Sequence, residues 1–295
     1  MNCAHGSDES HGCTASSHEF ARAHRSRLPA GKARAGGAPR GEYAVERRLH
    51  RLDIDTHSDN PSLPQQAGAP EAGAGLALAV ALLTLWLPWR LRRWLLQQLC
   101  GYRIAHGARI GLSLVAVPRL RLDAGARIGH LNVIKGARIE LAAHASIGNL
   151  NWIAGLPKDS ARHFHDQPER DPALTVETHA AITSRHFIDC SHHVRIGAFS
   201  IVAGAWTQIL THAIDLRLNR QSSAPVEIGR HCFIGTGSVV LKGSRLPDCS
   251  VLQANSTLAG AFDQPYTLYS GVPAREARAL PRDYAYFSRD RGYVE

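Results

Sequence analysis

The chain has 295 residues, and its hydrophobic content of 44% is ordinary for a globular protein. Its formal net charge is +9, and residues 1–75 hold nine basic and nine acidic residues, so the whole excess lies in residues 76–295. Such a charge could attract an anionic cofactor, a phospholipid surface or nucleic acid. No nucleic-acid-binding motif accompanies it, so we expect no nucleic-acid partner. The six cysteines form no Cys-x-x-Cys pair, which indicates free thiols in a reducing compartment.

Residues 1–75 are rich in Ala, Gly, Ser, His, Arg and Pro and lack aliphatic periodicity, which predicts a disordered, low-complexity segment. We expect residues 76–100 to form a helical segment that is both apolar and basic. Its apolar run of 14 residues, Leu76–Trp89, is too short to span a bilayer, and three of the next four residues are arginine. Pro88 can open a helix that runs to about Leu99. We expect this helix to cap the end of a repeat domain or to lie on a membrane surface, and both roles are compatible.

A six-residue repeat of aliphatic side chains begins at Ile104. It slips in phase near Ile139 and again at Ile196, and it is most regular over residues 226–259. A period of six is neither that of a helix nor that of a flat strand, and it is typical of a parallel β-helix in which three hexads form one coil. The members in phase are Ile104, Ile110, Ala116, Leu122, Ile128 and Ile134, then Ile147 and Ile153, then Val176, Ile182, Ile188 and Val194, then Ile196 and Val202, and finally Ile228, Ile234, Val240, Leu246, Leu252 and Leu258.

Two interruptions break the repeat, at residues 155–175 and 213–224. Both are polar or charged, and we expect them to be loops that leave the coil, where solenoids usually carry binding function. The sequence therefore predicts a β-helix domain over residues 101–262. A C-terminal tail follows over residues 263–295.

Four features in this order resemble the hexapeptide-repeat acyltransferases, in particular the branch of polysaccharide- and colanic-acid-type acetyltransferases. They are the Ile-Gly hexads, a His-containing segment at Thr211–Asp215 before a loop, the restart at Val226–Gly229, and the closing motif Gly271-Val272-Pro273-Ala274-Arg275. The resemblance implies an all-β fold, the left-handed parallel β-helix, and a homotrimer with its site between subunits. It also implies acetyl-CoA as donor, a sugar or polysaccharide precursor acylated on oxygen or nitrogen, and a cytoplasmic location or one at the inner face of the membrane.

His212 is the candidate general base, because an imidazole titrates near neutral pH and His212 ends a repeat segment before the second interruption. The alternative is a surface histidine on a turn. Asp215 could fix the tautomer of that imidazole and stabilise its protonated form. Equally, it could close a turn on its own backbone.

The acyl donor needs a slot for its pantetheine arm and cations for its phosphates. Gly235, Gly237 and Ala254 lack bulky side chains and would let the donor approach the backbone, although tight corners also require small residues. Lys242 and Arg275 are the candidate phosphate contacts, with solvated charge as the alternative. No metal is expected.

Two other functions fit a β-helix. One is a non-catalytic scaffold that organises an assembly or a membrane, which residues 76–99 would favour. The other is a zinc enzyme similar to the γ-carbonic anhydrases, a resemblance that requires two histidines five residues apart. No pair in residues 101–295 has that spacing, so this function ranks last.

Overall fold

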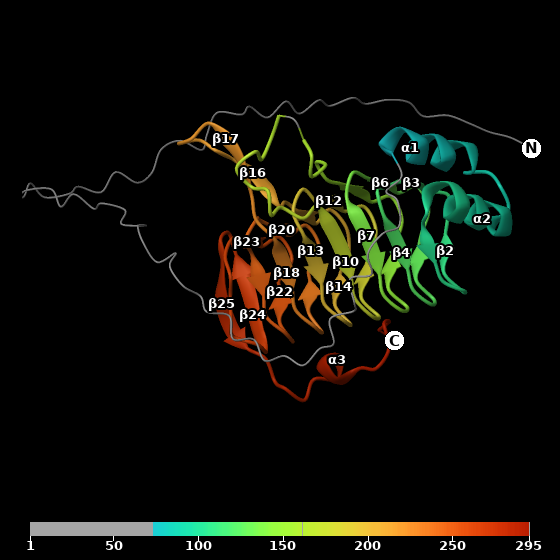
Figure 1. The fold of residues 1–295 in the computed structure, drawn as a ribbon. Coiled ribbons are helices and arrows are strands. Elements are labelled where there is room, and N and C mark those ends of the chain that lie inside the picture. Colours follow the sequence, from blue (N-terminus) through green and yellow to red (C-terminus); the bar gives the residue numbers. More distant parts are fainter. Residues whose placement is uncertain (1–72, 161, 295) are drawn as a thin grey trace, which may run out of the picture. The chain divides into compact units, whose positions relative to one another are not determined.

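The computed structural model describes residues 73–160 and 162–294, so most of the segment predicted to be disordered, residues 1–75, lies outside the described part. The prediction was wrong for its last residues, because Ala74 and Gly75 already belong to a helix. Short strands wind into a coil with three flat walls, which we name sheets A, B and C (Figure 1). In spatial order, sheet A contains β1 (Arg103–Ile104), β4 (Leu120–Leu122), β7 (Arg138–Leu141), β10 (Ala173–Val176), β13 (Val194–Ile196), β18 (Val226–Ile228) and β21 (Arg245–Leu246).

Sheets B and C complete each turn of the coil. Sheet B contains β2 (Arg109–Ile110), β5 (Arg127–Ile128), β8 (Ser146–Ile147), β11 (Ala181–Ile182), β14 (Ile201–Val202), β19 (Phe233–Ile234), β22 (Val251–Leu252), β24 (Thr267–Gly271) and β25 (Ala274–Ala279). Sheet C contains β3 (Leu114–Ala116), β6 (Val133–Lys135), β9 (Trp152–Ala154), β12 (Phe187–Asp189), β15 (Gln208–Ile209), β20 (Val239–Val240) and β23 (Thr257–Leu258). Strands within these sheets pair in parallel, apart from β24 with β25. Sheet B thus continues into the tail predicted at residues 263–295.

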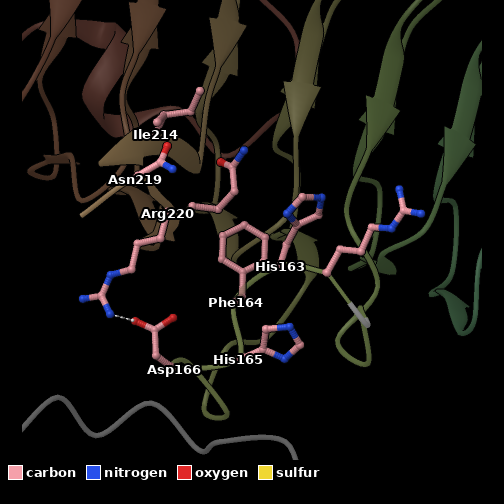
Figure 2. A pocket seen from close by; sticks show the side chains of 9 residues that line it. His163, Phe164, His165, Asp166, Ile214, Asn219 and Arg220 are labelled. Carbon is pink, nitrogen blue, oxygen red and sulfur yellow. Dashed lines mark ion pairs between the residues drawn. The ribbon is translucent and has the colours of Figure 1, made fainter. Parts of the chain in front are cut away.

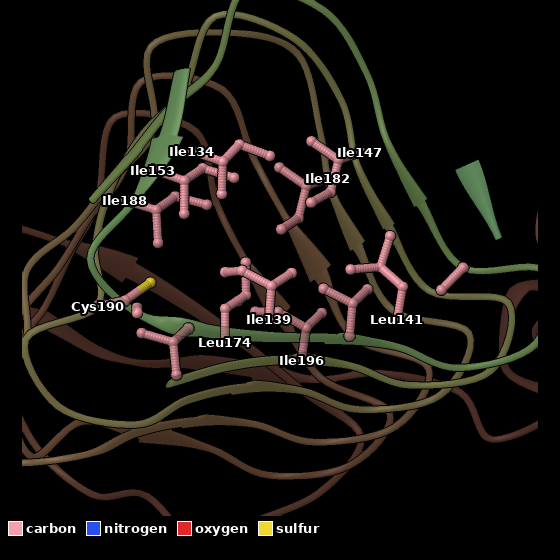
Figure 3. Close-up of a cluster of buried hydrophobic side chains, with 14 of the residues drawn as sticks. Ile134, Ile139, Leu141, Ile147, Ile153, Leu174, Ile182, Ile188, Cys190 and Ile196 are labelled. Atoms are coloured by element: carbon pink, nitrogen blue, oxygen red, sulfur yellow. The ribbon is translucent and has the colours of Figure 1, made fainter. Parts of the chain in front are cut away.

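The aliphatic ladder forms the core, with each wall contributing one stack of side chains (Figure 3). Ile228, Ile234, Val240, Leu246, Leu252 and Leu258 are all fully buried. One assignment was wrong: Val115, not Ala116, points inward and pairs in register with Ile134. The phase slips have a physical reason, because several strands of sheet A are long enough to turn two alternate residues inward, as Ile139 and Leu141 do in β7. The fold class is therefore confirmed as a left-handed parallel β-helix.

Both interruptions of the repeat leave the coil at the corner that joins sheet C to sheet A. The first is shorter than predicted: it covers residues 155–172, because residues 173–175 already belong to β10. The second is a β-hairpin and not the loop we expected. Its strands β16 (His212–Asp215) and β17 (Arg220–Ser223) pair antiparallel and project from the corner (Figure 1).

The apolar, basic segment forms two helices, α1 (Ala74–Leu83) and α2 (Trp89–Cys100), with Pro88 immediately before α2. In α2, Arg92 donates through Nη1 and Nη2 to the carbonyls of Gly111 and Ser113, at 2.7 and 2.9 Å, and Arg93 donates to the carbonyl of Ile104. These guanidinium groups satisfy first-coil carbonyls that no preceding strand could pair with. The helix is thus a cap on the first coil.

One short helix follows the coil. Helix α3 (Ala285–Ser288) lies along sheet B, where Tyr286 contacts the ring of Phe233. In the described part of the chain, no helix has the length and apolar character needed to cross a membrane.

Buried polar side chains line the corner between sheets B and C. The amide oxygen of Asn132 accepts from the backbone of Asn151, and that of Asn151 accepts from the backbone of His186. His186 accepts from the Thr207 backbone through Nδ1, so Nε2 carries the proton and donates to Thr183 Oγ1. Burial lowers the pKa of His186 to about 4, because the neutral ring fits this network and the charged ring would lose solvation.

We expect this histidine to make the protein acid-sensitive. The unfolded chain takes up the His186 proton near pH 6.5 and the folded chain only near pH 4, so stability falls as the pH drops through that window. Between pH 7 and pH 4.5 the His186 contribution is about 2 to 3 kcal/mol. His186→Asn gives this position the same side chain as Asn132 and Asn151 in the neighbouring coils. Urea unfolding at pH 7 and at pH 4.5 should show that the variant loses this part of the pH dependence of stability. An unchanged pH dependence in the variant would contradict the assignment.

Candidate active site

His212 opens β16, where the hairpin leaves the corner between sheets C and A. Its ring nitrogen Nδ1 lies 2.6 Å from Oδ2 of Asp189, the last residue of β12 in the preceding coil. The His212 side chain is 32% exposed, whereas the Asp189 side chain is only 6% exposed. An imidazole that is partly open to solvent thus rests on a buried carboxylate.

The carboxylate of Asp189 receives hydrogen bonds on both oxygens. Oδ1 accepts from the backbone and hydroxyl of Ser191, at 3.0 and 2.6 Å. Oδ2 accepts from the backbone and hydroxyl of Thr211, both at 2.8 Å, and from the backbone of His212 at 3.1 Å. Burial alone would raise the pKa of Asp189, but the hydrogen bonds from His212, Ser191 and Thr211 outweigh it and lower the pKa to about 2.

The protonation of His212 follows from this arrangement. Because ionised Asp189 can only accept hydrogen bonds, Nδ1 of His212 must carry a proton, and Nε2 of the neutral ring then carries a lone pair. Within the described residues, no hydrogen bond engages Nε2. His212 is therefore oriented as a proton acceptor.

The structure places Asp215 away from this pair. Asp215 lies three residues beyond His212 on the same strand, so the two side chains leave β16 on opposite faces. Its carboxylate accepts from the backbone of Arg217 and Leu218, at 3.0 and 3.1 Å, and closes the turn of the hairpin. The turn-closing alternative describes Asp215, and the carboxylate that contacts His212 belongs to Asp189.

The first insertion covers the other side of His212. Phe164 is buried and meets the His212 ring edge to face, with centroids 6.1 Å apart. Arg170, which is fully buried, holds the base of the loop: its guanidinium donates to the carbonyls of Leu156, Pro157 and Ser191 and stacks 4.4 Å from the Phe164 ring centroid. The loop is thus tied to the same corner as Asp189.

The loop and the hairpin are joined directly as well. Gln167 accepts from the backbone and hydroxyl of Ser223 in β17 and donates to its carbonyl. Asp166 forms an ion pair of 2.8 Å with Arg220. Between them lies a pocket of about 490 Å³ with Phe164 in its wall (Figure 2). The complete lining consists of Arg162, His163, Phe164, His165, Asp166, Ile214, Asn219, Arg220 and Gln221.

Three of the predicted donor contacts lie together at the corner between sheets B and C. A Cβ atom on Gly235 would come within 2.4 Å of the Ala254 backbone nitrogen, and one on Gly237 within 2.4 Å of Asn255 Oδ1. Gly237 also has a φ of +68°. Close stacking of neighbouring coils thus requires both glycines, whatever else they do. Ala254 is exposed on the outside of the same corner.

The two predicted cations are separated. Lys242 lies in the corner between sheets C and A, where its ammonium donates to Ser222 in β17. It therefore belongs to the same corner as His212. Arg275 is exposed on β25, and its guanidinium donates to the neighbouring Ala274 carbonyl.

Three groups of this site were missed by sequence reasoning: Asp189, Phe164 and Arg170. Asp189 follows the inward-pointing Ile188, one coil before His212, and the register that aligns Ile188 with Ile209 places it opposite Leu210, two residues before His212. The other two lie within the first insertion, whose path no repeat determines. Among residues 73–160 and 162–294, no three His, Cys, Asp or Glu side chains are grouped so as to hold a metal ion.

No protein-family model matches this chain, and no curated protein matches it significantly. Among solved structures, a variant of AntD, an N-acyltransferase from Bacillus cereus in complex with dTDP and coenzyme A, is similar at 12% identity and a TM-score of 0.41, over 63% of this chain and 88% of its own. The hexapeptide-repeat acetyltransferase VCA0836 from Vibrio cholerae is 18% identical with a TM-score of 0.38, over 72% and 96%. The polysialic acid O-acetyltransferase OatWY is 14% identical with a TM-score of 0.40, over 63% and 90%. At these identities and scores, the likeness says nothing about what this chain binds or acts on.

Proposed function

We propose that this chain transfers an acetyl group from acetyl-CoA to a hydroxyl or amine of a sugar or polysaccharide precursor. The observation that supports this most is the His212–Asp189 pair, in which a buried, hydrogen-bonded carboxylate leaves Nε2 of the imidazole as a free base. The acceptor would bind in the neighbouring pocket, whose wall includes Phe164, the residue that also contacts the His212 ring. The resemblance in the repeat, in the His212 segment and in the closing motif supports the same reaction.

The chemistry uses Nε2 twice. As the acceptor oxygen or nitrogen attacks the thioester carbon, Nε2 of His212 takes the acceptor proton, and ionised Asp189 stabilises the resulting imidazolium. When the tetrahedral intermediate collapses, the carbon–sulfur bond breaks and the imidazolium returns the proton to the thiolate of CoA. The imidazole is thereby restored, and no other group has to gain or lose a proton.

For the donor, Lys242 is the predicted cation that fits this location best. Lys242 is held against the hairpin that begins with His212, and its ammonium group can donate hydrogen bonds to a phosphate. Gly235, Gly237 and Ala254 lie at a different corner of the coil, and Arg275 lies on β25 in sheet B. These four residues would serve one donor together with His212 only if they came from a neighbouring subunit.

The outer face of sheet C supports self-association. The outward residues of sheet C are mostly apolar along the whole wall, whereas the outward residues of sheet A are mostly charged. The aligned outward residues of sheet C are Leu114, Val133, Trp152, Phe187, Gln208, Val239 and Thr257. Trp152 and Phe187 are exposed in the single chain. An exposed apolar wall of this kind is typical of an interface, and it adjoins the corner that carries His212. Because the resemblance implies three subunits, we propose that this wall forms the interface of a homotrimer.

Substituting a charge into this wall should separate the subunits. In analytical ultracentrifugation we expect the wild type near three times the chain mass of 32.1 kDa, and Phe187→Glu near the mass of one chain. Val294→Glu is the control and should retain the wild-type mass: Val294 is 63% exposed and follows Gly292, which lies against His179 at the corner between sheets A and B. A single-chain mass for the wild type, or an unchanged mass for Phe187→Glu, would refute the interface.

Thioester turnover tests the reaction itself. The purified full chain is incubated with acetyl-CoA and a panel of sugars, sugar nucleotides and amino sugars, and free CoA is measured with a thiol reagent. We expect CoA release above background with at least one acceptor and equimolar acetylated product. If CoA release never exceeds background across the panel, the protein is a scaffold without this reaction.

A further inference from the structure

Helix α1 buries small side chains and exposes large apolar ones, the reverse of the usual arrangement in an amphipathic helix. The residues that face the protein are the small Ala77 and Ala81 together with Val80, while large leucines face outward. The outward residues cover an arc of about 160° at 100° per residue, and none is polar. They are Leu76, Leu78, Ala79, Leu82 and Leu83, and Leu83 is 81% exposed.

The apolar surface continues through the turn and onto α2. Trp86, in the turn, is 80% exposed. On α2, the face opposite the buried Arg92 and Leu96 presents Leu91 and Trp94. The two helices pack side by side at the end of the coil that is far from the hairpin (Figure 1). We name the set Leu76, Leu78, Leu82, Leu83, Trp86, Leu91 and Trp94 the end patch.

The charge around the end patch has one sign. From residue 73 to residue 118, which includes both helices and the first coil, the sequence contains five arginines and neither aspartate nor glutamate. Arg90 is exposed on α2 between Trp86 and Trp94. An apolar surface with tryptophans at its margin and only positive charge nearby complements an anionic lipid surface, in which acyl chains lie beneath negative headgroups.

We propose that the end patch binds the surface of an anionic phospholipid bilayer. A helix of ten residues is about 15 Å long, half the thickness of the hydrocarbon core, so α1 lies in the interface and does not cross the bilayer. Leu82 and Leu83 enter the acyl region, Trp86 and Trp94 remain at its boundary, and Arg90 meets the phosphates. This contact is independent of acyl transfer and would hold the coil end-on at a membrane.

Vesicle flotation with the full chain tests the proposal. We expect the wild type to float with vesicles of phosphatidylcholine and phosphatidylglycerol, more weakly with phosphatidylcholine alone, and less at high salt. Leu83→Glu should weaken partitioning by about tenfold or more, because a charge replaces a side chain that enters the acyl region. Val272→Glu is the matched control, since Val272 is also apolar and 74% exposed but lies at the opposite end of the coil.

Two further readouts separate the contributions. Arg90→Glu should reduce binding to the anionic vesicles and leave binding to phosphatidylcholine unchanged. Anionic vesicles should also shift the tryptophan emission to shorter wavelength, and Trp86→Phe should reduce that shift. The proposal fails if the full chain floats with neither kind of vesicle. It also fails if Leu83→Glu floats like the wild type, or if Leu83→Glu lowers the oligomeric mass and so marks the end patch as a contact between copies.

Discussion

His212→Ala is expected to lower kcat for CoA release by about 10² to 10⁴, because it removes the group that takes the acceptor proton. The KM for acetyl-CoA should change little, since nothing in the proposed mechanism assigns His212 to donor binding. The fold should survive: the side chain is 32% exposed, and Asp189 retains five hydrogen bonds from Ser191, Thr211 and the backbone of residue 212. Steady-state kinetics and circular dichroism measure both effects.

The control for this variant is His106→Ala, at an exposed histidine near the first coil. It should have wild-type kinetics. If His212→Ala releases CoA as fast as the wild type while His106→Ala is also active, His212 is not the base.

Asp189→Asn should damage both activity and stability. An amide has one accepting oxygen, so its NH₂ group would face donors that the second carboxylate oxygen now satisfies. If that NH₂ faces His212, it donates to Nδ1, and the neutral ring then carries its proton on Nε2. A general base needs Nε2 without a proton, so kcat should fall on the order of 10² to 10⁴. Unsatisfied buried donors should lower the free energy of unfolding by about 3 kcal/mol. Denaturant unfolding and turnover measure the two losses separately.

Asp215→Asn provides the comparison that decides between the two aspartates. It removes only turn contacts on the exposed hairpin, so we expect a loss of less than about 1 kcal/mol and turnover close to that of the wild type. A loss of turnover in Asp215→Asn together with normal turnover in Asp189→Asn would show that the aspartate near in sequence, not the one near in space, supports His212.

The sequence predicts the coil well because its signal is local and repeated. Each hexad carries one inward aliphatic side chain. The six-residue spacing of neighbours such as Ile228 and Ile234 therefore indicates the fold without reference to residues far away in the sequence. The errors arise where sheet A turns two residues inward, near Ile139 and Ile196, and where Val115 replaces Ala116. At these points a strand or corner differs in length from the average coil, and a fixed period cannot register the difference.

The site is harder to predict because its residues come from three coils. His212 could be proposed from its position before an interruption. Its partner Asp189 is 23 residues earlier, and only the stacking of coils brings it to 2.6 Å. Phe164 and Arg170 depend on the path of an insertion, which is fixed by hydrogen bonds from Arg170 to carbonyls far along the chain. No local pattern contains that information.

The most direct test of the central claim is a crystal structure of the full chain with a non-hydrolysable acetyl-CoA analogue. The proposed mechanism requires the pantetheine arm to end at the corner between sheets C and A, with the acetyl group beside Nε2 of His212 and Asp189 still bound to Nδ1. An acetyl group at any other corner of the coil would contradict the assignment of His212.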